Sequence, residues 1–238
     1  TTLSGNRGIT LGSSGGTVAT GVNNVTISSA IAGPGQLTKT GAGVLTLSGS
    51  NTYAGGTALD GGSITVSSSS GIGTGTFRIG AGAASSGTLF FNNTSADTLS
   101  NNIELPAPGA ATTYEILKAS SGSGTGTLLD LTGVLSGGNA NSTLRLNSNV
   151  SGDNTTTFRL GANNTIAGTI DLNRGTLIVT GNNSLGTATL WLNGNGNSTL
   201  GDLRFESPVT LANNIVLVGS PNPSPIHTGG HTVTLSGT

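Results

Sequence analysis

The chain has 238 residues, a formal net charge of −1 and only 7% charged residues, whereas 41 residues are glycine. Such sparse and balanced charge excludes the basic stripe by which proteins bind nucleic acids, and the absence of Cys excludes disulfides and thiolate metal sites. No run of residues approaches the roughly 20 apolar positions that a membrane-spanning helix needs, so we expect no membrane insertion of this segment.

Short alternating segments run along the whole chain and predict strands. Apolar residues alternate with Thr or Ser at Val44–Ser48 and Ser63–Ser67, and the Gly, Asn and Asp clusters between such runs are typical of turns. Disordered chains instead have high net charge and few β-branched residues, so we interpret the chain as a repetitive β protein without helices. The predicted strands are Ile9–Leu11, Val25–Ser28, Gln36–Lys39, Val44–Leu47, Ser63–Val66, Phe77–Ile79, Thr88–Phe91, Ile103–Leu105, Tyr114–Lys118, Leu128–Leu131, Thr143–Leu146, Thr157–Leu160, Thr169–Leu172, Thr176–Val179, Thr189–Leu192, Leu203–Phe205, Val209–Leu211, Ile215–Val218 and Thr232–Leu235.

Two long stretches of the chain are copies of one unit. A single shift along the sequence, which later drifts by one residue either way, places Gly62–Val66 on Gly175–Val179, and the copies span about 51–105 and 164–217. Many short strands suit a solenoid, a sandwich or a barrel. The long repeat and the excess of Gly, Ser, Thr and Asn favour the solenoid.

The two ends of the chain are also related to each other. Arg7–Leu11 resembles Asn213–Leu217, and Val25–Ser28 resembles Val233–Ser236. The chain thus starts and stops partway through a unit, and we expect it to be a slice of a longer repeat array.

The stretch Leu37–Val66 carries a longer pattern, Leu-x-Lys-x-Gly-x-Gly-x-Leu-x-Leu-x-Gly-x-Asn-x-Tyr-x-Gly-x-Thr followed by Gly-x-Leu-x-Val. With it the stretch resembles the autotransporter-associated β-strand repeat, found in the passenger regions of bacterial autotransporters and in other giant bacterial surface proteins. Ile64 in place of Leu is the one departure, whereas the second copy lacks the Lys-x-Gly-x-Gly start and has Ile166 for Tyr53. The resemblance implies a right-handed parallel β-helix on the outside of a bacterium. The matching positions are Leu37, Lys39, Gly41, Gly43, Leu45, Leu47, Gly49, Asn51, Tyr53, Gly55, Thr57, Gly62, Ile64 and Val66.

A parallel β-helix would also explain the composition. With roughly 20–25 residues per coil, the chain makes about ten coils, stacked into one rod-like domain over residues 1–238. Few charges are expected, because like charges stacked at coil spacing repel each other. Proline cannot donate to a central ladder, so Leu105–Gly109 and Ser220–Pro225 are predicted to lie in loops that project from the rod and not in domain linkers.

Few residue clusters have the chemistry of a metal site. His227 and His231 are four residues apart, but the Gly-Gly between them excludes a helical metal pair, and we expect two solvated loop histidines. Asp60 and Asp153 could be calcium ligands, yet neither lies in a recognised calcium loop or nonapeptide repeat, so turn capping is favoured. We predict no metal site, no cofactor-binding residue and no cofactor.

Catalytic and ligand-binding residues are equally sparse. A glycan-cleaving β-helix needs two carboxylates that face each other across a cleft, and the acidic residues here are scattered singly. Trp191 and Tyr53 could stack on sugars, although packing in the core or at an edge is the favoured interpretation. We predict no catalytic residue. The acidic residues are Asp60, Asp97, Glu104, Glu115, Asp130, Asp153, Asp171, Asp202 and Glu206, and the arginines expected to point outward from strands are Arg78, Arg145, Arg159, Arg174 and Arg204.

The leading hypothesis is a structural protein, not an enzyme: a secreted or cell-surface β-helical rod of an autotransporter-like passenger or extracellular fibre, acting as scaffold or spacer. Its ends are open strand edges, and open edges pair with other chains unless capped. No cap is recognisable at Thr1 or Thr238, so we expect self-association into filaments, head to tail or laterally, or continuation into further repeats. The alternative is an adhesin that binds a glycan or host protein through loops at 106–113 and 220–231, and a third is a polysaccharide-degrading enzyme.

Overall fold

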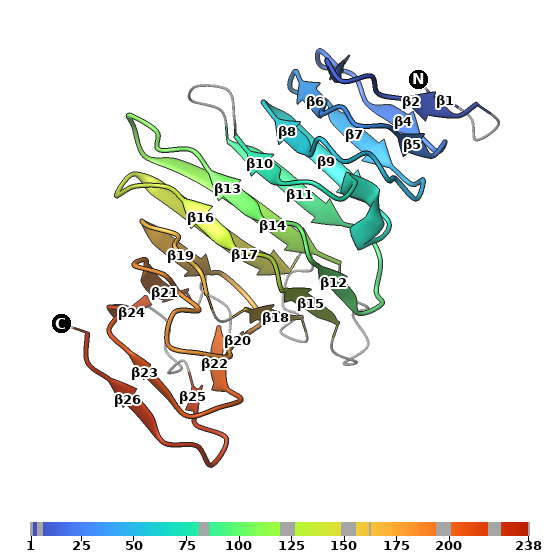
Figure 1. Ribbon diagram of the computed structural model, residues 1–238. Helices are drawn as coiled ribbons and strands as arrows, with labels where there is room; N and C mark the ends of the chain where they lie inside the picture. Colours follow the sequence, from blue (N-terminus) through green and yellow to red (C-terminus); the bar gives the residue numbers. More distant parts are fainter. Residues whose placement is uncertain are drawn as a thin grey trace.

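The computed structural model describes residues 2–3, 7–80, 86–119, 127–148, 156–161, 163–193, 201–218 and 225–237. Over these residues the chain winds into a parallel β-helix, whose coils stack along one axis from the blue N-terminal end to the red C-terminal end (Figure 1). Every strand pairing in the described residues is parallel, which excludes the hairpins of an antiparallel sandwich there. The predicted fold class is therefore confirmed, while the right hand of the coil stays a prediction.

Face 1 of the β-helix is a ten-stranded sheet to which each coil contributes one strand. Val25 pairs with Leu45, whereas Ile116 pairs with the more distant Leu146, so the coils differ in length. The expected number of about ten coils is confirmed. In sheet order the strands are β1 (Thr2–Leu3), β4 (Val25–Ile27), β7 (Val44–Leu47), β9 (Gly62–Val66), β11 (Gly87–Phe91), β14 (Thr112–Lys118), β17 (Ser142–Ser148), β19 (Thr169–Leu172), β21 (Thr189–Asn193) and β24 (Ile215–Val218).

Face 2 follows face 1 in each coil. It begins as a two-stranded sheet, continues through residues 51–54 and the 3-10 turn η1 (Ser69–Ile72), and ends as a six-stranded sheet. The irregular middle is joined to its neighbours by backbone hydrogen bonds, such as Thr52 N to Ile31 O and Thr74 N to Tyr53 O. Its strands are β2 (Ile9–Thr10) and β5 (Ile31–Ala32), then β12 (Asp97–Leu99), β15 (Leu128–Leu131), β18 (Thr157–Leu160), β20 (Thr176–Val179), β22 (Asp202–Phe205) and β25 (Ile226–His227).

Face 3 completes each coil. Six strands form its first part, residues 163–167 and 183–187 continue it through backbone hydrogen bonds such as Thr165 N to Leu135 O, and two strands end it. The strands are β3 (Gly16–Ala19), β6 (Leu37–Thr40), β8 (Thr57–Leu59), β10 (Phe77–Ile79), β13 (Ile103–Leu105) and β16 (Leu135–Gly137), then β23 (Val209–Leu211) and β26 (Val233–Leu235).

The core is a set of apolar columns that run along the helix axis. On face 1, Leu45, Ile64, Leu89 and Ile116 are paired in register one above the other, and each is 0% exposed. Burying a side chain of this size contributes roughly 1.5–3 kcal/mol. The alternation of the sequence follows directly, because every second residue of a strand enters such a column.

Glycine at the corners allows neighbouring coils to approach closely. A Cβ on Gly43 would lie 1.9 Å from the backbone oxygen of Asn23 in the preceding coil, and Gly41 has a φ of 87° that other residues rarely adopt. The Gly-x-Gly of the sequence pattern is therefore a requirement of coil stacking.

All strands predicted from the alternation are present, with ends shifted by a residue or two. Several strands were missed because they are short or contain Gly, Ala or Asp, and these are β1, β3, β5, β8, β12, β16 and β25. The prediction that Arg174 points outward from a strand is wrong, since it lies in the turn between β19 and β20. The division of residues 1–238 into one domain stays a prediction.

The two predicted loops also need correction. Thr112 and Thr113 belong to β14, so the first loop spans 106–111, and the next coil holds it: Asn139 Nδ2 donates to Pro108 O at 3.0 Å. In the second loop, residues 220–224 lie outside the described residues, and Ile226–His227 form strand β25.

The two sequence copies lie on different faces of the helix. The shift between the copies carries β7 on face 1 to β18 on face 2, and β10 on face 3 to β21 on face 1. Because β7 belongs to the third coil and β18 to the seventh, the copies are related by four coils and one further face. The sequence alone had not indicated this rotation.

Candidate functional site

Lys39, the lysine of the sequence pattern, is buried inside a corner of the coil. It lies between Val18 and Leu59 in a face 3 column and is 0% exposed. Its Nζ donates to the carbonyls of Gly41 at 2.7 Å, Gly61 at 2.9 Å and Thr40 at 3.2 Å. Desolvation by burial lowers the pKa of this lysine. The ammonium thus joins carbonyls of two successive corners.

Two asparagines at equivalent sequence positions bridge three coils each. Asn51 accepts from Ile31 N at 2.8 Å and donates to Gly71 O at 2.6 Å. Asn164, its counterpart in the second copy, accepts from Leu135 N at 2.8 Å and donates to Ser184 O at 2.7 Å. Both are buried, so the pattern asparagine pairs backbone groups that a corner leaves open.

Tyr53, a candidate for sugar stacking, belongs to the core. It is 0% exposed, and its hydroxyl forms a 2.6 Å hydrogen bond with Thr57 Oγ1. Burial raises the pKa of Tyr53 to about 12, although the hydrogen bond to Thr57 opposes the shift. The prediction of core packing is confirmed for this residue.

A second buried lysine forms an ion pair at the corner between faces 1 and 2. Lys118 Nζ lies 2.7 Å from Asp97 Oδ2, with side-chain exposures of 0% and 8%, and also donates to Asn93. Asn93 in turn donates to Asp97 Oδ2 at 2.8 Å. Desolvation lowers the pKa of Lys118, and Asp97 partly offsets this effect. Asn93 also donates to Ser67 O, so the cluster joins coils four, five and six.

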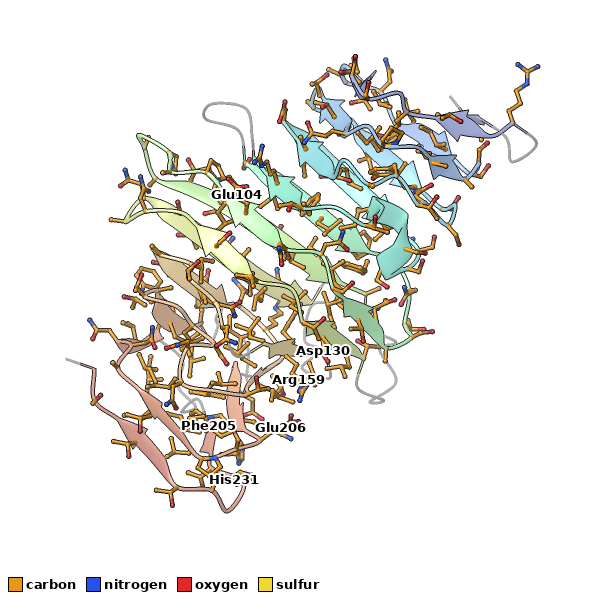
Figure 2. The ribbon with its side chains drawn as sticks, viewed as in Figure 1. Glu104, Asp130, Arg159, Phe205, Glu206 and His231 are labelled. Carbon is orange, nitrogen blue, oxygen red and sulfur yellow. The ribbon has the colours of Figure 1, made fainter. Side chains whose placement is uncertain are left out.

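The outward carboxylates are mostly paired with arginines. Figure 2 shows Arg159 between Asp130 and Glu206, to which it donates at 3.0 and 2.8 Å. These hydrogen bonds, that to Glu206 first, raise the pKa of Arg159. The arrangement differs from a glycosidase pair, because a cation bridges the two acids where substrate and water would have to lie. Further ion pairs join Arg78 to Glu104, Arg145 to Asp171 and Arg204 to Asp202.

The candidate metal ligands are dispersed. His227 lies on β25 with Nε2 3.5 Å from Asp202 Oδ1, and is therefore a strand residue and not the predicted loop histidine, whereas His231 lies in the following turn. Asp60 lies in the short connection between β8 and β9, and Asp153 lies outside the described residues. Among the residues that the structure describes, no three His, Cys, Asp or Glu side chains gather to hold a metal.

The prediction that Trp191 packs in the core or at an edge is wrong, because its side chain points outward from β21 and is 41% exposed. A cavity of about 340 Å³ opens between residues 182–189 and 210–214, and its wall includes Thr189, two residues before Trp191 on β21. Sequence reasoning missed this cavity, whose walls include Asn182, Asn183, Thr189, Thr210, Asn213 and Asn214.

Comparison with known proteins places the sequence pattern in a family. Residues 37–66 and 150–179 match the passenger-associated-transport repeat, and the two matches are offset by the same shift as the internal copies. The chain carries two copies of this repeat. The second copy is matched although it lacks the Lys-x-Gly-x-Gly start, whose aligned positions are 152, 154 and 156, the first two of them outside the described residues.

The chain is also similar to part of an autotransporter. Over 91 residues, or 37% of its length, the chain is 43% identical to the Adhesin BmaC autotransporter of Brucella suis biovar 1 (strain 1330). The matched part is 3% of that protein, so the chain spans a small fraction of its relative. No solved structure matches the chain. In the part of the chain that the structure describes, no helix is long and apolar enough to cross a membrane.

Proposed function

We propose that the chain is a structural rod of a secreted, surface-exposed bacterial passenger, where it acts as scaffold or spacer. The observation that carries this proposal is the role of the repeat residues: Lys39, Gly43, Asn51 and Tyr53 all serve contacts within and between coils. Because the polar side chains of the motif hydrogen-bond within and between coils, the motif supports a mechanical role. The similarity to an adhesin autotransporter supports the surface location.

We further propose that the last coil receives another coil on its open side. Leu217, Ile226 and Leu235 pair in register with the buried residues Leu192, Leu203 and Leu211, and so continue three interior columns. They are 56%, 39% and 47% exposed. These exposed apolar side chains lie on strands whose outer edges are unpaired among the described residues. Such a surface favours further repeats or a second copy of the chain stacked head to tail.

Electron microscopy of the native surface material and of the purified chain tests both parts. We expect thin rods, with lengths for the purified chain that fall in multiples of one β-helix if copies stack. Replacing Leu217 and Leu235 by Lys should leave single short rods with an unchanged circular dichroism spectrum. Globular particles would overturn the rod, and a monomer at high concentration for the unaltered chain would overturn the stacking of copies.

An adhesin function is the second candidate, because the relative is named an adhesin. In the form predicted from the sequence it would bind a glycan or host protein through the loops at 106–113 and 220–231. Deleting residues 107–110 and 220–224 should then abolish binding to host cells and leave the rod intact. Binding that survives the deletions would show that the loops are not the site.

A further inference from the structure

The cavity that Thr189 lines has the volume of a small-molecule site and polar walls. Its volume of about 340 Å³ lies in the range of small-molecule sites. The lining consists of Asn, Thr, Gly and Ala, with no charged side chain. Such walls suit a neutral ligand rich in hydroxyl groups, because amides and hydroxyls both donate and accept hydrogen bonds.

Several polar groups of the cavity are available to a ligand. Asn182 accepts from Thr210 N at 2.8 Å through its oxygen, which leaves its amide NH₂ free among the described residues. The side chains of Asn183, Thr189 and Thr210 have no hydrogen-bond partner in the part of the chain that the structure describes. Asn182, Asn183 and Thr210 are exposed, so their donors and acceptors face solvent.

Trp191 offers an exposed aromatic surface two residues along β21 from the cavity wall at Thr189. Thr189, in the cavity wall, and Trp191 point to the same outer side of β21, because the intervening Leu190 is buried. Val216 pairs with Trp191 in register and is 39% exposed, so an apolar patch adjoins the polar walls. Asp171, the other neighbour of Trp191 in the sheet, is buried and paired with Arg145, and it offers little charge to a ligand.

The first copy of the unit shows that folding does not require this tryptophan. Alignment of the copies places Trp191 on Arg78 and, where the shift has become one residue shorter, Val216 on Glu104. Arg78 and Glu104 are likewise paired in register, and they form a solvated ion pair at 2.8 Å. The coil therefore accepts a charged pair at this position, whereas the second copy carries an exposed aromatic and aliphatic pair beside a neutral polar cavity.

We propose that this cavity and Trp191 form a binding site for a neutral glycan. The apolar face of a pyranose ring stacks on the indole, which offers a large rigid surface. Its hydroxyls pair with Asn183, Thr189 and the Asn182 amide. None of the cavity residues belongs to the loops at 106–113 and 220–231, and the site does not depend on the stacking of rods proposed above.

An array of neutral, sialylated and sulfated oligosaccharides, probed with the whole chain, tests the site. We expect neutral glycans to bind. Titration of the best one should change the emission of Trp191, which is the only Trp of the chain. The key variant is Trp191→Arg with Val216→Glu, which installs the ion pair of the first copy, and Arg78→Ala is the matched control.

The double variant should bind the glycan about tenfold more weakly or worse, as expected when a stacking residue is lost, while Arg78→Ala binds normally. Asn183→Ala should weaken binding as well, without removing any aromatic surface. Circular dichroism checks that each variant folds, and rod length by microscopy should not change. Binding of charged glycans alone, no binding, or full binding by the double variant would overturn the proposal.

Discussion

Asn51 and Asn164 perform the same task on different faces of the coil. Each amide accepts from a backbone N–H of the preceding coil and donates to a carbonyl of the following one, yet Asn51 lies on face 2 and Asn164 on face 3. The same asparagine-bridged corner can therefore form at different turns of the chain from one face to the next.

Replacing Asn51 by Ala should destabilise the fold by about 2–4 kcal/mol, because Ile31 N and Gly71 O would both be buried without partners. Urea unfolding followed by circular dichroism measures the change. Asn92→Ala, at an exposed position, is the control and should stay within about 0.5 kcal/mol of the parent. Equal effects of the two changes would contradict the assigned role.

Breaking the buried Lys118–Asp97 pair should cost about 3–5 kcal/mol. Lys118→Met leaves the Asp97 carboxylate buried without its cation, and chemical unfolding reports the loss. Adding Asp97→Asn to this variant should restore much of the stability, because no buried charge then remains.

The exposed Arg78–Glu104 pair provides the comparison. Arg78→Met should cost less than about 1 kcal/mol, since solvent screens both partners. A loss for Lys118→Met no larger than that for Arg78→Met would show that burial does not govern the pair.

Tyr53 should make the fold sensitive to alkali. Its folded pKa of about 12 lies above the ordinary value of 10.0, so the folded state holds the proton more tightly than the unfolded chain. The stabilisation of the folded state by the neutral, buried Tyr53 is complete below pH 10, and it is lost as the pH rises toward 12. The shift corresponds to between about 2 and 3 kcal/mol.

The measurement compares Tyr53→Phe with its parent, both in a Tyr114→Phe background that removes the other tyrosine. The lowered pKa values of Lys39 and Lys118 act in the opposite direction, but they are common to both chains and cancel in the difference. The parent should lose stability above pH 10 relative to the variant. Parallel pH profiles would be inconsistent with a buried, neutral Tyr53.

Gly43→Ala should be one of the most damaging small substitutions. The new Cβ would meet the backbone oxygen of Asn23 at 1.9 Å, and backbone atoms of a neighbouring coil cannot move aside easily. We expect a loss of about 3 kcal/mol or more in thermal or urea unfolding. Gly109→Ala, where nothing lies within 4 Å, should be nearly neutral.

Much of the fold could be predicted from local features of the sequence. Alternation located most strands, because side chains of a strand point to opposite sides whatever the neighbouring strand is. The pattern around Lys39 and Asn51 indicated the repeat, and the shift between the internal copies is the spacing of its two matches. Short strands such as β16 and β25 were missed, since only their pairing with a strand of the preceding coil defines them.

The candidate site depended on the tertiary structure far more than the strands did. Thr189 and Asn214 are distant in the sequence, and they line one cavity only because β21 and β24 stack. Nothing in the sequence showed that Trp191 is exposed while Tyr53 is buried.

By itself the sequence determined most of the strands, the repeat and the apolar side of those strands, because these follow from the chemistry of neighbouring residues. The tertiary structure alone decided which face each strand joins, which side chains meet across coils and where the surface opens. The physical reason is that coil stacking pairs residues that a whole coil of chain separates. The lengths of all connections within a coil together set which residues are paired with the next coil, and no local stretch of sequence shows that total length.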